Sequence, residues 1–195
     1  SACLVGSEMC IRDRFYDNEI IQMTAGTTGY SPDFVKQQEE NMTNSLLYDL
    51  FHQAYASVPH GDAPKDAIFE AEAAVMKQLA QKGNCVILGR CADYILRDIP
   101  HCLRVYLHAP FTARVERVAQ LQQQTADWAR EKVRREDQHR SAYYRYYTGQ
   151  KKGQGENYHL CINTQLGEDY VEQTILGALK AEFSKTEKKN LEKVS

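Results

Sequence analysis

The sequence has no long hydrophobic run, no cysteine pair at metal-binding spacing and no large excess of charge of one sign. The longest apolar runs, such as residues 85–88, are far too short to cross a membrane, and the chain does not open with the hydrophobic core of a signal peptide. The six cysteines form no C-x-x-C pair, which favours a reduced, cytoplasmic protein over a disulfide scaffold. With 195 residues and a net charge of −2, we expect one globular domain without general affinity for nucleic acid.

The charge is unevenly distributed along the chain. Residues 111–152 contain ten basic and five acidic side chains, a net charge of +5, so the remainder carries −7. A positive segment on an acidic body points to a local anionic ligand rather than to a long polyanion.

Short apolar runs alternate with helical patterns. Runs bounded by Gly or Pro predict strands at residues 85–88, 103–107 and 159–162. Apolar periodicity and capping residues predict helices at residues 18–23, 66–82, 126–147 and 169–183, and a further helix that starts at Pro32 with Ser31 as its N-cap. This alternation indicates an α/β domain with a mostly parallel sheet and helices on both faces. We expect the Lys- and Glu-rich tail at residues 184–195 to be disordered.

Arg90 directly follows a predicted strand and Gly89. Parallel α/β sheets bind ligands at the carboxyl ends of their strands, and a guanidinium presents a planar set of donors suited to phosphate. The alternative is a structural role, in which Arg90 pairs with a nearby carboxylate such as Asp93 or Asp98. We favour the ligand interpretation because charge at a strand end of an open sheet is usually functional.

Three further charged residues, Arg134, Asp137 and Arg140, lie in the predicted helix at residues 126–147. Their spacing of three places Asp137 where it can orient either arginine. Arginines on a mobile helical arm can neutralise charge on a transferring phosphoryl group. The alternative is a solvated helix with intrahelical ion pairs, and the sequence alone leaves both interpretations open.

Four tyrosines follow in the same helix, at positions 143, 144, 146 and 147. They could stack a base or close a lid. Aromatic residues at helical spacing more often pack in a core, so we expect packing for at least two of them.

Asp17 marks the junction between a short predicted strand and the helix at residues 18–23. It is either the N-cap of that helix or a group that reaches a metal-bound water at the edge of the sheet. The sequence does not separate these two roles.

With these features placed, the chain resembles the cytidylate kinase-like family of P-loop kinases. The matching strings are FYDNEII (15–21), NSLLYDL (44–50), CVILGRCADYILRD (85–98), VYLHAP (105–110), RREDQHRSAYYRYYTG (134–149) and ENYHLCIN (156–163). The resemblance implies a three-layer α/β/α P-loop kinase fold with a helical lid at about residues 111–152. It also implies transfer of a phosphoryl group from ATP to a nucleoside monophosphate such as cytidylate, with Mg²⁺ as cofactor.

The same resemblance implies roles for the candidate residues. Arg90 and Asp93 would belong to the site of the monophosphate acceptor, and Asp17 would lie near the acceptor and the metal. Arg134 and Arg140 would be catalytic lid arginines that close over the phosphates, with Asp137 holding them.

Residues 1–14 depart from the family pattern, which begins with a strand and a Gly-rich phosphate loop just before the segment matched by FYDNEII. The string SEMCIRDR (7–14) is typical of translated adaptor sequence, so we expect residues 1–14 to be a non-native leader before a kinase-like domain at residues 15–183. The first strand and the phosphate loop are then expected to be missing. Without a cradle of backbone N–H groups for the phosphates of ATP, we expect this chain to be inactive.

Two other functions remain open at this stage. A non-catalytic nucleotide-binding or regulatory module would keep the acceptor site and lose catalysis. A single-stranded nucleic-acid binder would use the basic, Tyr-rich helix as a stacking platform, but the acidic remainder of the chain disfavours it.

Overall fold

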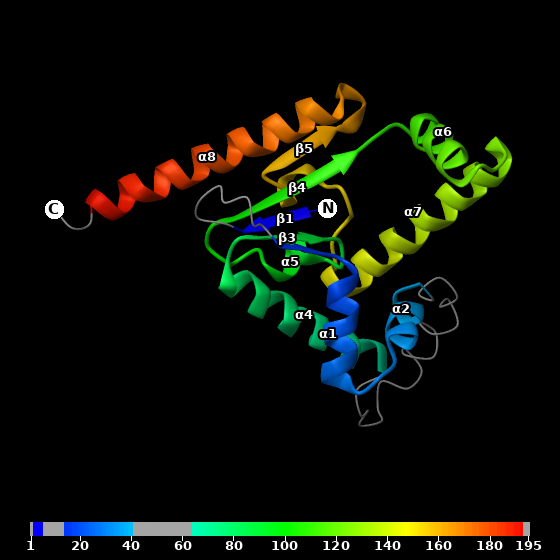
Figure 1. Ribbon diagram of the computed structural model, residues 1–195, viewed down its shortest axis with the longest axis horizontal. Helices are drawn as coiled ribbons and strands as arrows, with labels where there is room; N and C mark the ends of the chain where they lie inside the picture. The colour runs from blue at the N-terminus through cyan, green and yellow to red at the C-terminus, as the bar shows by residue number, and fades with distance from the viewer. Residues whose placement is uncertain (1, 6–13, 41–63, 193–195) are drawn as a thin grey trace.

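The protein is described here by a computed structural model, which covers residues 2–5, 14–40 and 64–192 (Figure 1). Most of the expected leader and the matching string at residues 44–50 lie outside these described residues. The elements, in chain order, are β1 (Ala2–Val5), β2 (Arg14–Tyr16), α1 (Asn18–Thr28), α2 (Pro32–Glu40), α4 (Pro64–Lys82), β3 (Cys85–Leu88), α5 (Ala92–Ile95), β4 (Cys102–His108), α6 (Phe111–Gln122), α7 (Ala126–Thr148), β5 (Leu160–Asn163) and α8 (Glu168–Glu192). Two short 3-10 turns, Gly155–Asn157 and Thr164–Leu166, flank β5.

Five strands form one sheet in the order β2-β3-β1-β4-β5. β2 runs parallel to β3, with Phe15 opposite Val86, and β4 runs parallel to β5, with Tyr106 opposite Cys161. Each of these pairs is joined through intervening helices, as parallel strands require. The expected α/β architecture is therefore present, and the strands predicted within residues 85–162 all form.

β1 makes the sheet mixed rather than mostly parallel, which the sequence analysis did not foresee. It lies in the centre of the sheet, antiparallel to both β3 and β4, with Leu4 opposite Val86 and Leu103. Residues 2–5 belong to the segment at residues 1–14 that was expected to be a non-native leader. A strand forms there because β3 and β4 would otherwise each leave a row of backbone N–H and C=O groups unpaired inside the sheet.

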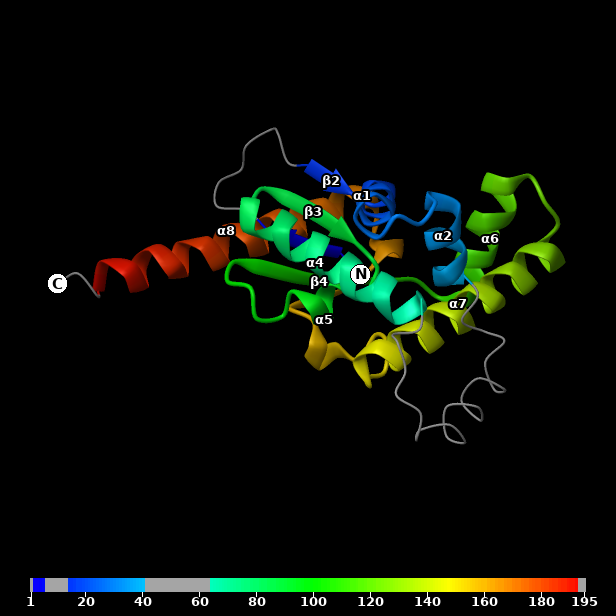
Figure 2. The same ribbon diagram turned by 90° about the horizontal axis from the view of Figure 1, so that it is seen from below.

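Helices cover both faces of the sheet, as predicted. Neighbouring residues of a strand point to opposite faces. Accordingly, Cys102 packs into the core under α1, α4 and α5, whereas Leu103 packs against α8. Figure 2 shows the same arrangement, with α4 on the near side of the sheet and α8 behind it. The larger core contains the fully buried side chains of Ile20, Met76 and Ile87.

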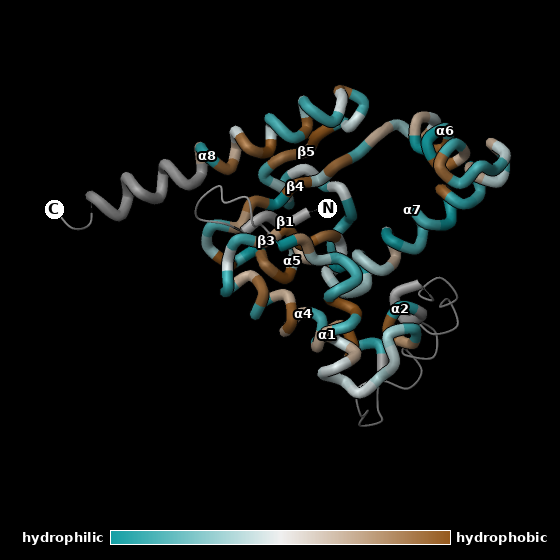
Figure 3. Tube along the Cα trace, viewed as in Figure 1, coloured by the Kyte–Doolittle hydropathy of each residue, from teal (hydrophilic) through white to brown (hydrophobic). Residues whose placement is uncertain are grey.

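α6 and α7 form a helical hairpin that extends away from the sheet (Figure 1). α7 begins where the Thr125 side chain accepts a hydrogen bond from the backbone N–H of Trp128, and it ends at Gly149, which has a φ of 67°. The hairpin has its own small core of Val115, Ala129 and Val133. Figure 3 shows that α7 is otherwise largely hydrophilic, as expected for an arm that projects from the body.

The C-terminal helix is longer than predicted. α8 continues through Glu192, although we expected disorder from residue 184 onward. Lys and Glu are good helix formers and can pair one turn apart, so a charged tail can prolong a helix that has already begun. No helix within the described ranges combines the length and the apolar character needed to span a bilayer.

The core under β3 should dominate stability. We expect Ile87→Ala to lower the free energy of unfolding by about 2–5 kcal/mol, because Ile87 is fully buried and its truncation leaves a cavity. Leu121→Ala, at a side chain that is 67% exposed near the tip of the hairpin, should change it by no more than about 0.5 kcal/mol. Urea unfolding followed by circular dichroism checks both values, and equal effects of the two substitutions would contradict this assignment of the core.

Candidate functional site

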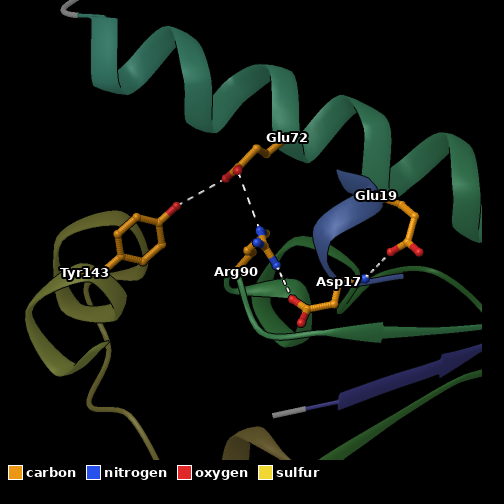
Figure 4. Close-up of polar contacts among 5 residues, drawn as sticks. All are labelled: Asp17, Glu19, Glu72, Arg90 and Tyr143. Atoms are coloured by element: carbon orange, nitrogen blue, oxygen red, sulfur yellow. Dashed lines mark hydrogen bonds and ion pairs between the residues drawn. The ribbon is translucent and has the colours of Figure 1, made fainter. Parts of the chain in front are cut away.

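Arg90 and Asp17 meet at the carboxyl edge of the sheet. Asp17 follows β2 and Arg90 follows β3 by two residues, and these strands are parallel neighbours. The Arg90 Nη1 donates a hydrogen bond of 2.8 Å to Asp17 Oδ1 (Figure 4). Asp17 occupies the N-cap position of α1, but its side chain forms no capping hydrogen bond. Asp17 is therefore not a side-chain cap of α1 but forms an ion pair with Arg90, and its role near a metal stays a prediction.

The turn that carries Arg90 has an uncommon backbone. Gly89, Arg90 and Cys91 have φ angles of 68°, 47° and 56°, so three successive residues lie in the left-handed region. For the two residues with a Cβ, this conformation costs on the order of 1–3 kcal/mol each and concentrates at functional sites. The turn closes where the backbone N–H of Ala92 donates to the Gly89 carbonyl at 2.9 Å. The position of Arg90 at the edge of the sheet therefore depends on a strained, left-handed backbone at Arg90 and Cys91.

Glu72, which the sequence analysis did not select, completes the environment of Arg90. Its side chain extends from α4 and is fully buried, and its Oε1 lies 3.7 Å from Arg90 Nε. The Tyr143 hydroxyl of α7 donates to Glu72 Oε2 at 3.3 Å (Figure 4). A buried carboxylate is costly unless it is paired and hydrogen-bonded. Glu72 and Asp17 together hold the guanidinium from two sides, and the side chain of Arg90 is only 10% exposed.

Asp93 does not contribute its carboxylate to the same surface. It is buried, and its Oδ2 accepts a hydrogen bond of 2.7 Å from the Tyr144 hydroxyl. Burial and this hydrogen bond raise the pKa of Tyr144 well above its usual range. Asp93 therefore links α5 to α7, because it lies in the first turn of α5, and its role in binding the acceptor stays a prediction.

Three of the four tyrosines pack against the body of the protein, which confirms the expectation for at least two. Besides Tyr143 and Tyr144, the ring of Tyr147 stacks on Phe69 at 3.9 Å, and its hydroxyl donates to the Lys65 carbonyl at 3.1 Å. Tyr146 is 43% exposed. These four tyrosines therefore do not form a continuous surface on which bases could stack.

The hairpin presents a cluster of charged groups, but their pairing differs from the prediction. Asp137 was expected to hold Arg134 or Arg140. Instead its Oδ1 accepts a hydrogen bond of 2.7 Å from Nη1 of Arg114, in the first turn of α6. Arg114 also donates from Nε to the carbonyl of Ala109 at 3.1 Å. Asp137 thus links α7 to the end of β4.

The two predicted lid arginines take partners one turn away in their own helix. Arg134 pairs with Glu131 at 3.1 Å, and Arg140 lies 3.7 Å from Glu136. Their side chains are 56% and 66% exposed, so these ion pairs contribute little to stability. Arg134 also approaches the ring of Phe111 at 5.7 Å. Both arginines are thus held loosely and exposed to solvent.

Arg114 and Glu72 are the main site residues that sequence reasoning missed. Arg114 lies seven residues beyond the strand predicted at residues 103–107, in the first turn of α6, so the strand-end rule applied to Arg90 did not select it. Glu72 carried no such signal, because an acid inside an amphipathic helix is ordinarily exposed. Its packing against Arg90 in the folded protein is what identifies Glu72 as a residue of the site.

The described residues contain no group of three His, Cys, Asp or Glu side chains that could hold a metal ion. Mg²⁺ does not need such a cage, because it is commonly held by one or two carboxylates together with waters and substrate phosphates. Asp17 suits this role, since its side chain is 44% exposed and only Oδ1 is engaged among the described residues.

Comparison with known proteins agrees with these observations. Residues 11–166 match the cytidylate kinase-like family, and the chain belongs to that family. Among solved structures, the chain is similar to an uncharacterized protein from Eubacterium ventriosum, with a TM-score of 0.57 and 19% sequence identity over 84% of this chain and 90% of that chain. At this identity the similarity shows the fold alone. No curated protein matches the sequence. Family membership confirms the resemblance and indicates a nucleotide-related, kinase-like function.

The anchoring of α7 can be tested through Tyr144. We expect Tyr144→Phe to lower the free energy of unfolding by about 1–3 kcal/mol, because the buried carboxylate of Asp93 loses a hydrogen-bond donor. Tyr170→Phe is the matched control, since that side chain is 52% exposed, and it should change stability by no more than about 0.5 kcal/mol. Chemical denaturation at pH 7 gives both values. Identical stability of the two variants would show that Tyr144 does not anchor the helix.

Proposed function

We propose that this protein serves ATP-dependent phosphoryl transfer to a nucleoside monophosphate, with cytidylate as the acceptor that its family suggests. The observation that carries the proposal is the placement of Arg90. It lies at the carboxyl edge of parallel strands, in a strained turn, with its guanidinium oriented by Asp17 and Glu72. Ligands of open α/β sheets bind at this edge.

Arg90 suits the phosphate of the acceptor for a physical reason. A phosphate monoester carries up to two negative charges, and a guanidinium can donate two parallel hydrogen bonds to its oxygens. The two carboxylates orient Arg90 before a ligand arrives, which reduces the entropy lost on binding. Asp17 would share its second oxygen with a water of the magnesium shell.

The charged groups of the hairpin supply the second part of the proposal. Phosphoryl transfer proceeds through a transition state with charge spread over the phosphoryl oxygens, and arginines lower its free energy. Arg134 and Arg140 are exposed and weakly paired, so they can exchange their glutamates for phosphate oxygens. Asp137 would act through Arg114, to which it is bonded, rather than through the lid arginines.

The described residues provide fewer of the groups that a site for the phosphates of ATP requires. The sequence contains no Gly-rich loop that opens a helix behind a strand, and none of the strand-to-helix connections in the described residues has that form. For the proposed reaction the described residues supply an acceptor site and lid arginines, whereas the donor needs a phosphate loop. We therefore expect the 195 residues by themselves to bind the acceptor monophosphate without turning over ATP. A non-catalytic binding module is the second candidate, and the same missing loop favours it.

Replacement of Arg90 tests the acceptor site. We expect Arg90→Lys to raise the dissociation constant for CMP at least about tenfold, or about 1.4 kcal/mol, because lysine keeps the charge but loses the paired donors. Isothermal titration calorimetry measures the constant. Arg97→Lys is the control, because that arginine is 47% exposed and pairs with its neighbour Asp98. CMP binding that Arg90→Lys leaves unchanged would assign Arg90 a structural role.

Activity measurements test the donor side. We expect no turnover of ATP by the 195-residue chain with CMP, UMP, dCMP or AMP, because phosphoryl transfer depends on positioned phosphates. A variant that carries a family-like strand and phosphate loop before Phe15 should release ADP in a coupled assay. Turnover by the unmodified chain would refute the proposed lack of a donor site. Inactivity of both, together with the absence of CMP binding, would refute the kinase proposal.

A further inference from the structure

Tyr143 is linked to the arginine of the candidate acceptor site through one buried carboxylate. Its hydroxyl, from α7, donates to Glu72 Oε2 at 3.3 Å, while Glu72 Oε1 lies 3.7 Å from Arg90 Nε (Figure 4). The two oxygens of Glu72 therefore face two different elements, the helical hairpin on one side and the turn after β3 on the other. A displacement of this carboxylate changes the surroundings of the Arg90 guanidinium.

The plane of a glutamate carboxylate is not fixed by the side chain itself. Rotation about the last side-chain bond of glutamate is broad rather than confined to staggered positions, so hydrogen bonds have to fix the carboxylate. Glu72 is fully buried, and an incompletely bonded charge is costly in such a place. The hydrogen bond from Tyr143 holds Oε2 of Glu72 and thereby directs Oε1 toward Arg90.

The hydroxyl of Tyr143 is itself placed by aromatic packing. The ring of Tyr143 meets the Phe69 ring edge-on, at 6.3 Å between centroids and 68°, and it meets the Tyr147 ring at 4.8 Å and 61°. Such edge-to-face pairs are favourable. Phe69 and Glu72 are three residues apart in α4, so the ring and the carboxylate that Tyr143 contacts lie on one face of that helix. Tyr143 is therefore a firmly packed group, as the orientation of another side chain requires.

We propose that Tyr143 is a positioning residue of the acceptor site. It fixes Glu72, and Glu72 holds the guanidinium of Arg90 in the orientation that receives the phosphate of a nucleoside monophosphate. This inference rests on the proposed function, in which Arg90 binds that phosphate. Tyr143 acts through Glu72 rather than on the substrate. Because Tyr143 belongs to α7, the affinity for the acceptor depends on how the C-terminal turns of this helix dock onto α4.

Binding of CMP to the full chain, measured by isothermal titration calorimetry, tests this proposal. We expect Tyr143→Phe to raise the dissociation constant of CMP at least about fivefold, because the ring stays and the donor to Glu72 is lost. Tyr147→Phe is the matched control. It removes a hydroxyl that also bonds α7 to α4, at the Lys65 carbonyl, and it should change the constant less than about twofold. Equal effects of the two substitutions would overturn the proposal, because they would show that Tyr143 has no particular part in the site.

A double-mutant cycle separates positioning from a merely structural role. If Tyr143 acts through Arg90, Tyr143→Phe should raise the dissociation constant of CMP less than about twofold in a chain that already carries Arg90→Lys. A general loosening of the packing between α7 and α4 would weaken binding in that chain as much as in the original protein. The full effect of Tyr143→Phe beside Arg90→Lys would therefore overturn the proposal.

Glu72→Gln tests the same link without a change at Tyr143. Glutamine keeps an oxygen that can accept from the Tyr143 hydroxyl, but it removes the charge that faces Arg90. We expect it to raise the dissociation constant of CMP at least as far as Tyr143→Phe does, and an unchanged constant would overturn the proposal. CMP binding that depends on Arg90 but not on Tyr143 would overturn this inference alone and leave the proposed function standing. Absence of CMP binding by the unmodified chain would remove both.

Discussion

The contact between Arg90 and the buried carboxylate of Glu72 is the interaction on which the site depends. Glu72 is fully buried, and a carboxylate in that position is tolerated only with a cation and hydrogen-bond donors beside it. Arg90 supplies the cation from a left-handed turn, and Tyr143 supplies a donor from α7. Asp17 then binds the same guanidinium from the end of β2. One ionic cluster thereby joins four segments of the chain at the carboxyl edge of the sheet.

The two ends of α7 pack against different parts of the protein. Its C-terminal turns are fastened to the body by Tyr143, Tyr144 and Tyr147, which bond to residues of α4 and α5. Its N-terminal turns pack on α6 through the small core of the hairpin. Closure of the hairpin as the predicted lid would therefore have to bend α7 before Tyr143, and it would carry Arg134 and Arg140 with it.

The central position of the sheet, between β3 and β4, is occupied by β1. β3 and β4 are each parallel to their outer neighbour, and between them lies a position that any strand with suitable length can fill. Residues 2–5 fill this position antiparallel to both neighbours, and their backbone pairs with the hydrogen-bonding groups of β3 and β4. The sequence analysis did not predict a strand at residues 2–5, whereas the prediction that residues 1–14 are a non-native leader stays a prediction.

The sequence by itself determined most of the local elements, although not β1 or α6, and it also determined the strand-end position of Arg90 and the family. Breakers and periodicity delimit β3 and α7 to within one residue, since both signals are local. The hydrogen-bond and ion-pair partners of these side chains were determined only by the tertiary structure. Arg90 meets Asp17 across 73 positions of the sequence, and Tyr143 meets Glu72 across 71. Asp137 accepts a hydrogen bond from Arg114, 23 positions away, and not from the arginines of its own helix. Helical spacing shows which side chains can meet within one element, but an ionic partner from another element depends on how the elements pack, and packing is not encoded in local spacing.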